Sequence, residues 1–265
     1  MNNPVLNVNA VSKDFGGIRA LDEVDLVVGD KEIVALIGPN GAGKTTFFNC
    51  ITGIYTPTSG DVIIDPEAEG VKARRINGKK PNIVTELGMA RTFQNIRLFP
   101  SMTALENVMI GTHCRTKSSI WGAISRNKTT RREEQAVIQR AYELLVLVGL
   151  DEYVNELASN IPYGKQRRLE IARALATDPF LLLLDEPAAG MNPQETKDLE
   201  RLIMEIREKF DISIMLIEHD MKMVMSMSDR IYVLDYGRMI ADGTPGQIAA
   251  NPDVIKAYLG EDHDD

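Results

Sequence analysis

The sequence is poor in cysteine and has no long apolar run. Cys50 and Cys114 are the only cysteines among 265 residues, so we expect no disulfide framework and a reducing cytoplasm. The longest apolar runs, Leu144–Leu150 and Phe180–Leu184, are far shorter than the roughly 20 residues of a membrane-spanning helix. The N-terminus lacks the charged start and apolar stretch of a secretory signal. We therefore expect a protein that does not itself cross the bilayer.

The chain also lacks an excess of positive charge. It has 30 Lys and Arg against 38 Asp and Glu, a net charge of -8. This balance gives no electrostatic attraction to nucleic acid or to an anionic membrane surface, and no nucleic-acid partner is expected. With 44% hydrophobic residues, the chain can bury the core of one large α/β domain or of two small ones.

Strand-like segments alternate with helix-like segments along most of the chain. Parallel strands need crossover connections, which are usually helical, so this order predicts a mostly parallel sheet covered on both faces. Strands are expected at Leu6–Val11, Val24–Val28, Glu32–Ile37, Asp61–Ile64, Phe180–Asp185, Ile212–Glu218, Arg230–Leu234 and Arg238–Ala241. Helices are expected at Gly43–Thr52, after the capping box Thr103–Glu106, and at Arg131–Val148, Lys165–Ala176, Pro193–Phe210 and Asp220–Ser228, with a last one after Asn251-Pro252.

Two segments interrupt this alternation. Residues Asp65 to about Thr85 are polar and charged, and we expect an exposed insertion there. Residues His113–Thr130 are rich in turn formers and show no clear period, so no element is assigned to them. His113 beside Cys114 has no second ligand pair at zinc spacing, which makes a metal site there a weak hypothesis.

A complete phosphate-loop motif follows the strand that ends at Ile37. Its glycines let backbone amides curve around phosphate oxygens, and the helix behind it points its positive end at them. Lys44 adds a charge for the β and γ phosphates, and the Thr45 hydroxyl suits Mg²⁺. The expected nucleotide-binding residues here are Gly38, Pro39, Asn40, Gly41, Ala42, Gly43, Lys44, Thr45 and Thr46. The motif predicts binding of a nucleoside triphosphate.

Two acids end the apolar strand Leu181–Leu184. A buried strand that ends in Asp185 and Glu186 calls for a nearby cation, and Asp185 suits magnesium. Glu186, one residue beyond, can accept a proton from a water that attacks the γ-phosphate. The alternative for Glu186 is a favourable charge at a helix N-terminus. At this point kinases, GTPases and many motors remain possible.

The stretch Ile161–Leu175, just upstream of these acids, resembles the signature segment of ABC ATPases. Further elements of that family occur in order, over about Leu6 to Leu259. By this resemblance Gln94 is the Q-loop residue, which contacts metal and water, and His219 is the switch histidine. Phe15 takes the place of the aromatic residue that stacks on adenine, and Ala189–Asn192 that of the D-loop. A phosphate-loop kinase does not explain residues 161 to 175.

The resemblance implies an α/β fold of the phosphate-loop NTPase (RecA-like) type. Its core is a mostly parallel sheet, accompanied by a small antiparallel β part and an inserted helical subdomain. The whole chain, residues 1–265, is then a single nucleotide-binding domain. The inserted subdomain is expected at residues 95–175, and a C-terminal helix with an acidic tail at residues 251–265.

The signature segment also implies a dimer. Amides at the start of its helix, near Gly164, can face a γ-phosphate, and in the family each signature closes over ATP held by the opposite subunit. Tyr163, Gly164 and Lys165 are therefore expected to contact a partner's ATP. The segment departs from the common Leu-Ser-Gly-Gly-Gln pattern, because Pro162 replaces the serine and Lys165 the glutamine. Lys165 is expected to supply positive charge in place of the lost hydroxyl.

The resemblance becomes closer to one group, the ATP-binding subunits of bacterial branched-chain amino acid importers. The sequence motifs that indicate this group lie at residues 185 to 193, at 217 to 222 and in Asn251–Gly260. That family implies ATP and Mg²⁺ as cofactors and a second, related ATPase subunit. It also implies two membrane permeases, a periplasmic binding protein, and a peripheral place on the cytoplasmic face of the inner membrane. Arg97–Pro100 are expected in the groove that binds a permease. The alternatives are the ATPase of a lipopolysaccharide exporter and a soluble ABC ATPase without a transport role.

Overall fold

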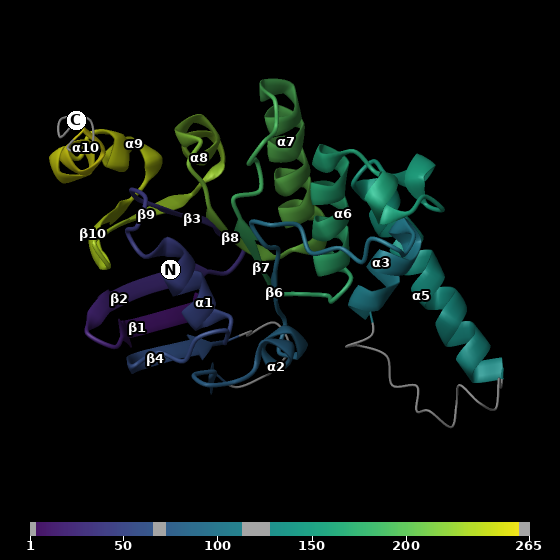
Figure 1. Cartoon of the computed structure of the whole chain (residues 1–265), viewed down its shortest axis with the longest axis horizontal. Coiled ribbons are helices and arrows are strands. Elements are labelled where there is room, and N and C mark those ends of the chain that lie inside the picture. The colour runs from purple at the N-terminus through teal and green to yellow at the C-terminus, as the bar shows by residue number, and fades with distance from the viewer. Residues whose placement is uncertain (1–3, 66–72, 113–127, 260–265) are drawn as a thin grey trace. The chain divides into compact units, whose positions relative to one another are not determined.

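The computed structural model describes residues 4–65, 73–112 and 128–259 (Figure 1). They form two compact units, one of Met1–Val84 with Phe180–Asp265 and one of Thr85–Pro179. The inserted subdomain expected at residues 95–175 falls inside the second unit. The acidic tail and the pair His113 and Cys114 lie outside the described residues. No helix of the described part is long and apolar enough to span a membrane.

The first unit contains two sheets. In the first sheet all pairings are antiparallel and the order is β2-β1-β4-β5, with bounds Ile18–Gly29, Pro4–Phe15, Ser59–Ile64 and Arg74–Arg75. In the second, strands of this unit run in the order β10-β9-β3-β8-β7, with bounds Arg238–Gly243, Arg230–Asp235, Ile33–Ile37, Ser213–Ile217 and Leu181–Asp185. Pairs β9-β3, β3-β8 and β8-β7 are parallel, and only β10 runs against its neighbour. The expected mostly parallel sheet and small antiparallel part are both present.

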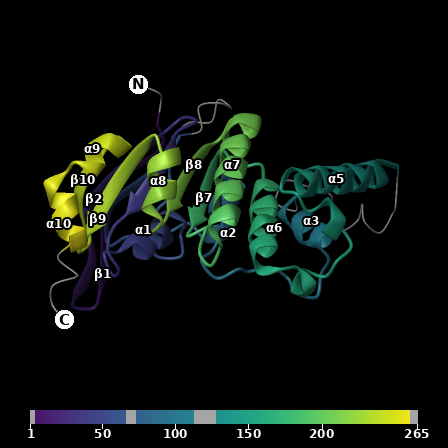
Figure 2. The same cartoon turned by 90° about the horizontal axis from the view of Figure 1, so that it is seen from above.

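Strands β3, β7 and β8 are buried along their whole length. Their near-continuous runs of Ile, Leu, Val and Met are typical of parallel strands that are covered on both faces. The helices of this unit are α1 (Lys44–Ile51), α7 (Pro193–Phe210), α8 (Met221–Met227), α9 (Pro245–Ala249) and α10 (Pro252–Leu259). Helices α7 and α8 lie side by side (Figure 2). Cys50, in α1, is 3% exposed and packs in the core, and this burial raises the pKa of its thiol to about 11.

Local sequence explains where α7 begins and ends. The Asn192 side chain accepts hydrogen bonds from the first-turn amides, Glu195 reaches back to the Asn192 amide, and Pro193 occupies the first helical position. Asp211 ends the helix in a left-handed conformation (φ 58°). A second capping box, of Thr244 and Gln247, opens the five-residue helix α9, which the sequence analysis missed because its apolar pattern is too short.

The second unit is mainly helical. Helices α3 (Ala104–Thr112), α5 (Lys128–Leu147) and α6 (Tyr163–Leu175) contact one another, and the short 3₁₀ turns Asp151–Tyr153 and Ala158–Asn160 lie between α5 and α6. The predicted capping box of α3 is confirmed, because Thr103 and Glu106 exchange hydrogen bonds. The C-terminal part of α5 buries Ala141, Leu144 and Leu145, whereas Ile138, on the same apolar pattern, is 39% exposed. Gly149 follows the helix at φ 69°. Strand β6 (Met89–Arg91) was not predicted.

The segment expected as an exposed insertion has more structure than predicted. Beyond residues 66–72, which the structure does not describe, it contains β5 and the helix α2 (Pro81–Glu86). Ile76 and Val84 are buried, so the prediction is wrong for these two residues. The Ile76 amide donates to the Val62 carbonyl, and the Asn77 side chain accepts from the Val62 amide at 2.9 Å. Pairing with β4 therefore draws this polar segment onto the antiparallel sheet.

Candidate functional site

Three predicted segments meet at one edge of the parallel sheet. In the strand register, Ile217 of β8 lies opposite both Leu36 of β3 and Asp185 of β7. The three strands therefore end at the same level. The phosphate loop follows β3, Asp185 ends β7 with Glu186 directly after it, and His219 follows β8. Loops beyond the carboxyl ends of parallel strands are where α/β proteins bind ligands.

Three glycines of the phosphate loop have positive φ angles, a conformation that favours glycine. Gly38, Gly41 and Gly43 have φ values of 150°, 79° and 106°. A Cβ atom on Gly38 would lie 2.0 Å from the Leu234 carbonyl oxygen of β9, so the loop passes too close to that strand for any side chain. Residues Gly43 and Lys44 then turn the chain into α1, whose first amides face the loop.

Lys44 is 6% exposed and directed into this loop. Its Nζ donates to the carbonyl oxygens of Gly38 at 2.6 Å and Pro39 at 2.8 Å. Thr45 beside it is exposed and Thr46 is half-buried, while Ala42 is buried and Asn40 and Gly41 are exposed. The loop thus combines the hydrogen-bonded ammonium of Lys44, the exposed hydroxyl of Thr45 and the positive end of α1. Together these groups suit a polyphosphate.

Glu186 and His219 face each other across the ends of β7 and β8. The Glu186 Oε1 and His219 Nε2 atoms are 2.9 Å apart. Glu186 has a left-handed backbone (φ 47°), which is uncommon for a residue with a side chain and is found at functional sites. Its amide donates to the Ile217 carbonyl at 2.9 Å, which holds it in this conformation. Asp185 is 3% exposed and precedes it.

The sequence analysis missed the role of Glu218. This residue is 4% exposed, and its carboxylate accepts hydrogen bonds from the amides of Ala188 at 2.7 Å and His219 at 2.9 Å. It therefore ties the turn after β7 to the turn after β8 and fixes the backbone that carries His219. An acid directly after a buried strand is the signal that could have identified it.

Phe15 ends β1 and is 41% exposed, so it is not a core residue. Its ring makes an edge contact with Tyr55, at 5.2 Å between centroids, and the Lys13 Nζ lies 4.9 Å from its centroid. An exposed aromatic ring with supporting neighbours can stack on a planar base.

The remaining predicted site residues belong to the second unit. Gln94 is exposed, and its carbonyl accepts a hydrogen bond from the buried Arg167 guanidinium, which also binds the Phe93 carbonyl. At the start of α6, Tyr163 is 49% exposed, Gly164 and Lys165 are half-buried, and no side chain caps the helix. The Lys165 Nζ donates to the Tyr153 hydroxyl at 2.9 Å and lies 4.1 Å from the centroid of that ring.

The donor atoms at the strand ends suit magnesium better than zinc. Asp185 and Thr45 offer oxygen atoms, and Mg²⁺ prefers oxygen ligands. The described part of the chain holds no group of three or more His, Cys, Asp or Glu side chains that could bind a metal by itself. This fits an ion held by one or two protein oxygens together with substrate phosphates and water.

Comparison with known proteins decides the family. A family model described as "ABC transporter" matches residues 21–189, and a second, described as "Branched-chain amino acid ATP-binding cassette transporter", matches residues 238–264. The chain belongs to the ABC transporter family. It is therefore an ABC ATPase, an enzyme that binds and hydrolyses ATP.

Curated relatives resemble this ABC ATPase over nearly its whole length. The high-affinity branched-chain amino acid transport ATP-binding protein LivG of Escherichia coli K12 is 48% identical over 98% of this chain and 100% of the relative. The corresponding protein BraF of Pseudomonas aeruginosa is 47% identical over the same shares of each chain. Among solved structures, an ATP-binding cassette of an ABC transporter in its ADP conformation matches with a TM-score of 0.82 and 31% identity, over 98% of this chain and 100% of that one. The expected phosphate-loop NTPase fold is thus confirmed.

Proposed function

We propose that this ABC ATPase powers the import of branched-chain amino acids. The LivG and BraF relatives carry that function in their names, and the model that matches residues 238–264 describes the same class of transporter. The observation that carries the enzymatic part is the contact between Glu186 and His219, beside the phosphate loop and at the end of the strand that supplies Asp185.

The chemistry follows from the placement of these residues. ATP places its phosphates on the loop Gly38–Thr46, where Lys44 and the α1 amides balance their charge. The Glu186 carboxylate orients a water and accepts its proton as the water attacks the γ-phosphorus, and His219 holds the carboxylate in position. A magnesium ion, when bound through Thr45, Asp185 and Gln94, would neutralise charge on the phosphate oxygens.

The working form we propose is a dimer with a second, related ATPase subunit. Phe15 stacks on the adenine of the chain's own ATP, while Tyr163, Gly164 and Lys165 contact ATP held by the partner. The start of α6 supports this proposal, because no side chain caps it. The amides of Lys165 and Gln166 donate to the Pro162 carbonyl, which leaves the amides of Tyr163 and Gly164, with the helix dipole, to attract an anion.

Two integral membrane permeases and a periplasmic binding protein complete the proposed assembly, with this chain on the cytoplasmic face of the inner membrane. A cavity of about 340 Å³ in the second unit supports permease docking. Its lining includes the exposed ring of Phe99, the apolar Ile110 and the charged Arg97, Arg173 and Glu170. A lining that combines apolar and charged side chains suits a short amphipathic helix of a permease.

Reconstitution into liposomes tests the proposal. We expect the full-length chain, assembled with its co-purifying permeases, partner ATPase and binding protein, to drive ATP-dependent uptake of leucine, isoleucine or valine. The same assembly carrying Glu186→Gln should bind ATP and take up none. Lipid-exporter subunits among the co-purifying membrane proteins, with no uptake of amino acid, would contradict the import function and leave the ATPase assignment intact.

A further inference from the structure

We propose that Asp22 is a positioning residue for the base of ATP, because it ties the segment that carries Phe15 to the phosphate loop. This inference rests on the proposed stacking of Phe15 on adenine. It concerns three parts of the first unit: the turn between β1 and β2, the turn between β9 and β10, and the loop before α1. Strand β2 contacts both β10 and α1, as Figure 1 shows for their ribbons.

Asp22 lies in β2 and accepts hydrogen bonds from two arginines. Its Oδ1 atom is 2.8 Å from the Arg19 Nη1, and its Oδ2 atom is 2.7 Å from the Arg238 Nε and 2.6 Å from the Arg238 Nη2. Arg19 also binds the Asp14 carboxylate at 2.9 Å, directly before Phe15. Ion pairs therefore run from Asp14, next to Phe15, through Arg19 and Asp22 to Arg238, the first residue of β10. The two acids and two arginines balance each other in charge.

The backbone of Asp22 joins the same turn to the phosphate loop. Its amide donates to the Gly237 carbonyl at 2.8 Å, and the Gly237 amide donates to the Ala42 carbonyl at 2.9 Å. A Cβ atom on Gly237 would lie 2.7 Å from the Ala20 carbonyl, so the turn is pressed against β2. A shift of Asp22 therefore moves Phe15 relative to Ala42, a residue of the phosphate loop.

The Asp22 carboxylate is less exposed than the two arginines that bind it. The side chain of Asp22 is only 18% exposed, although Arg19 and Arg238 are 54% and 73% exposed. Hydrogen bonds from these two arginines lower the pKa of the Asp22 carboxyl, and the bonds to Asp14 and Asp22 raise the pKa of Arg19. Charge-assisted hydrogen bonds to a carboxylate bound on both oxygens fix its orientation.

The separation between Phe15 and the phosphate loop should affect the affinity for ATP but not for a ligand that lacks a base. ATP must meet Phe15 with its base and the loop with its phosphates at the same time, so its affinity depends on their separation. Inorganic tripolyphosphate has no base and meets only the loop. Loss of Asp22 should therefore weaken ATP and leave tripolyphosphate unchanged, a difference that general loosening of the fold would not produce.

The experiment measures the dissociation constants of Mg²⁺-ATP and Mg²⁺-tripolyphosphate for the full-length chain by calorimetry. We expect Asp22→Ala and Arg238→Ala each to raise the constant for ATP by about threefold to tenfold, the range for two exposed charged contacts. The constant for tripolyphosphate should change by less than about twofold. The milder Asp22→Asn keeps an acceptor oxygen and should lie between wild type and Asp22→Ala.

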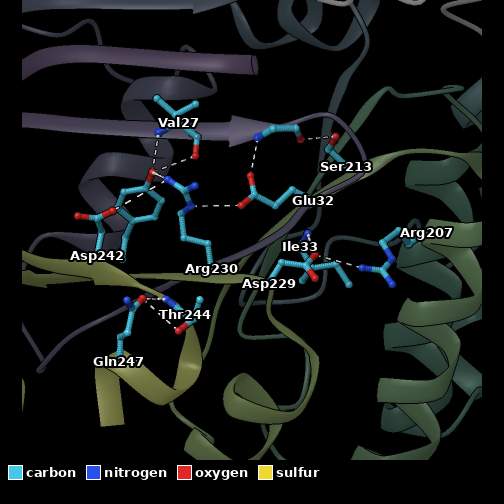
Figure 3. Close-up of polar contacts among 12 residues, drawn as sticks. Val27, Glu32, Ile33, Arg207, Ser213, Asp229, Arg230, Asp242, Thr244 and Gln247 are labelled. Carbon is cyan, nitrogen blue, oxygen red and sulfur yellow. Dashed lines mark hydrogen bonds and ion pairs between the residues drawn. The ribbon is translucent and has the colours of Figure 1, made fainter. Parts of the chain in front are cut away.

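Arg207→Ala is the matched control. Arg207 pairs with Asp229 at 3.1 Å in the same unit, and Asp229 also accepts from the amide of Ile33 (Figure 3). Ile33 begins β3, so this pair lies at the opposite end of the strand from the phosphate loop. Loss of this pair should change neither dissociation constant.

Four results would overturn the inference. Equal weakening of both ligands by Asp22→Ala would show a general disturbance of the loop, and no weakening of either would show that Asp22 positions nothing. If Phe15→Ala weakens ATP selectively and Asp22→Ala does not, only the role of Asp22 is wrong. If Phe15→Ala leaves the two constants unchanged, the proposed stacking on adenine is wrong and the inference falls with it.

Discussion

Replacing Glu186 by Gln is the most direct test of the proposed hydrolysis. The two side chains have the same shape, and the Gln oxygen can still accept a hydrogen bond from the His219 Nε2, 2.9 Å away. The backbone contact of the Glu186 amide with Ile217 also remains. The substitution therefore removes the ability to take a proton and keeps the geometry.

The expected loss follows from the role of a general base. Such a base contributes about 100-fold to 10,000-fold in rate, or about 2.7 to 5.5 kcal/mol in the barrier. We expect the rate of phosphate release at saturating Mg²⁺-ATP to fall within this range, while the dissociation constant for ATP changes by less than about threefold. The melting temperature should not fall, because no buried contact is lost.

Glu195→Gln provides the matched control for this prediction. Glu195 is an exposed carboxylate that caps α7 by accepting a hydrogen bond from the Asn192 amide at 2.9 Å. Gln can make the same cap, so hydrolysis should stay at the wild-type rate. Near-normal turnover by Glu186→Gln, with the control also normal, would refute the assignment of Glu186 as the base.

Two further predictions concern stability. Gly38→Ala places a Cβ atom 2.0 Å from a β9 carbonyl oxygen at φ 150°. Urea denaturation should show that this substitution lowers the free energy of unfolding by roughly 2 to 6 kcal/mol. Its control is Gly246→Ala, where a Cβ atom meets open space, and there the free energy of unfolding should change by less than about 1 kcal/mol. Burial raises the pKa of Glu170, whose carboxyl faces two arginines. Stability contributed by this group is therefore present at low pH and lost as pH rises through the folded-state pKa. The stability of Glu170→Gln relative to wild type should increase between pH 4 and pH 8, and a constant difference would contradict the shifted pKa.

Sequence patterns located the elements that carry the candidate site. The phosphate loop and the pair Asp185 and Glu186 each follow an apolar run that can only be a buried strand, and parallel strands bring their ends to one edge. The contact between Glu186 and His219 spans 33 residues, but both lie one or two positions beyond neighbouring strands. Because the strand ends could be predicted, the proximity of Glu186 and His219 could be predicted as well.

Other features depend on contacts that no local pattern encodes. Arg238 binds Asp22 across 216 positions, and which acid an arginine on β10 meets depends on the pairing of two sheets. Ile76 and Val84 lie in a charged segment, where two apolar residues give no period, yet pairing with β4 buries the first. The left-handed backbone of Glu186 likewise follows from its bond to Ile217 and not from its residue type.

The Lys165 side chain makes a contact that the signature segment does not predict. The sequence analysis expected its charge to replace a hydroxyl lost at Pro162, but its ammonium contacts the ring and hydroxyl of Tyr153. Turning it toward a partner's ATP would break a hydrogen bond and a cation–π contact, each worth about 0.5 to 1.5 kcal/mol. The amides of Tyr163 and Gly164 need no such rearrangement, because no side chain caps α6 and the Pro162 carbonyl accepts from the later amides of Lys165 and Gln166. In the proposed dimer, the backbone at the start of α6 therefore binds the partner's γ-phosphate first, and the Lys165 ammonium contacts the same ATP after it leaves the Tyr153 ring.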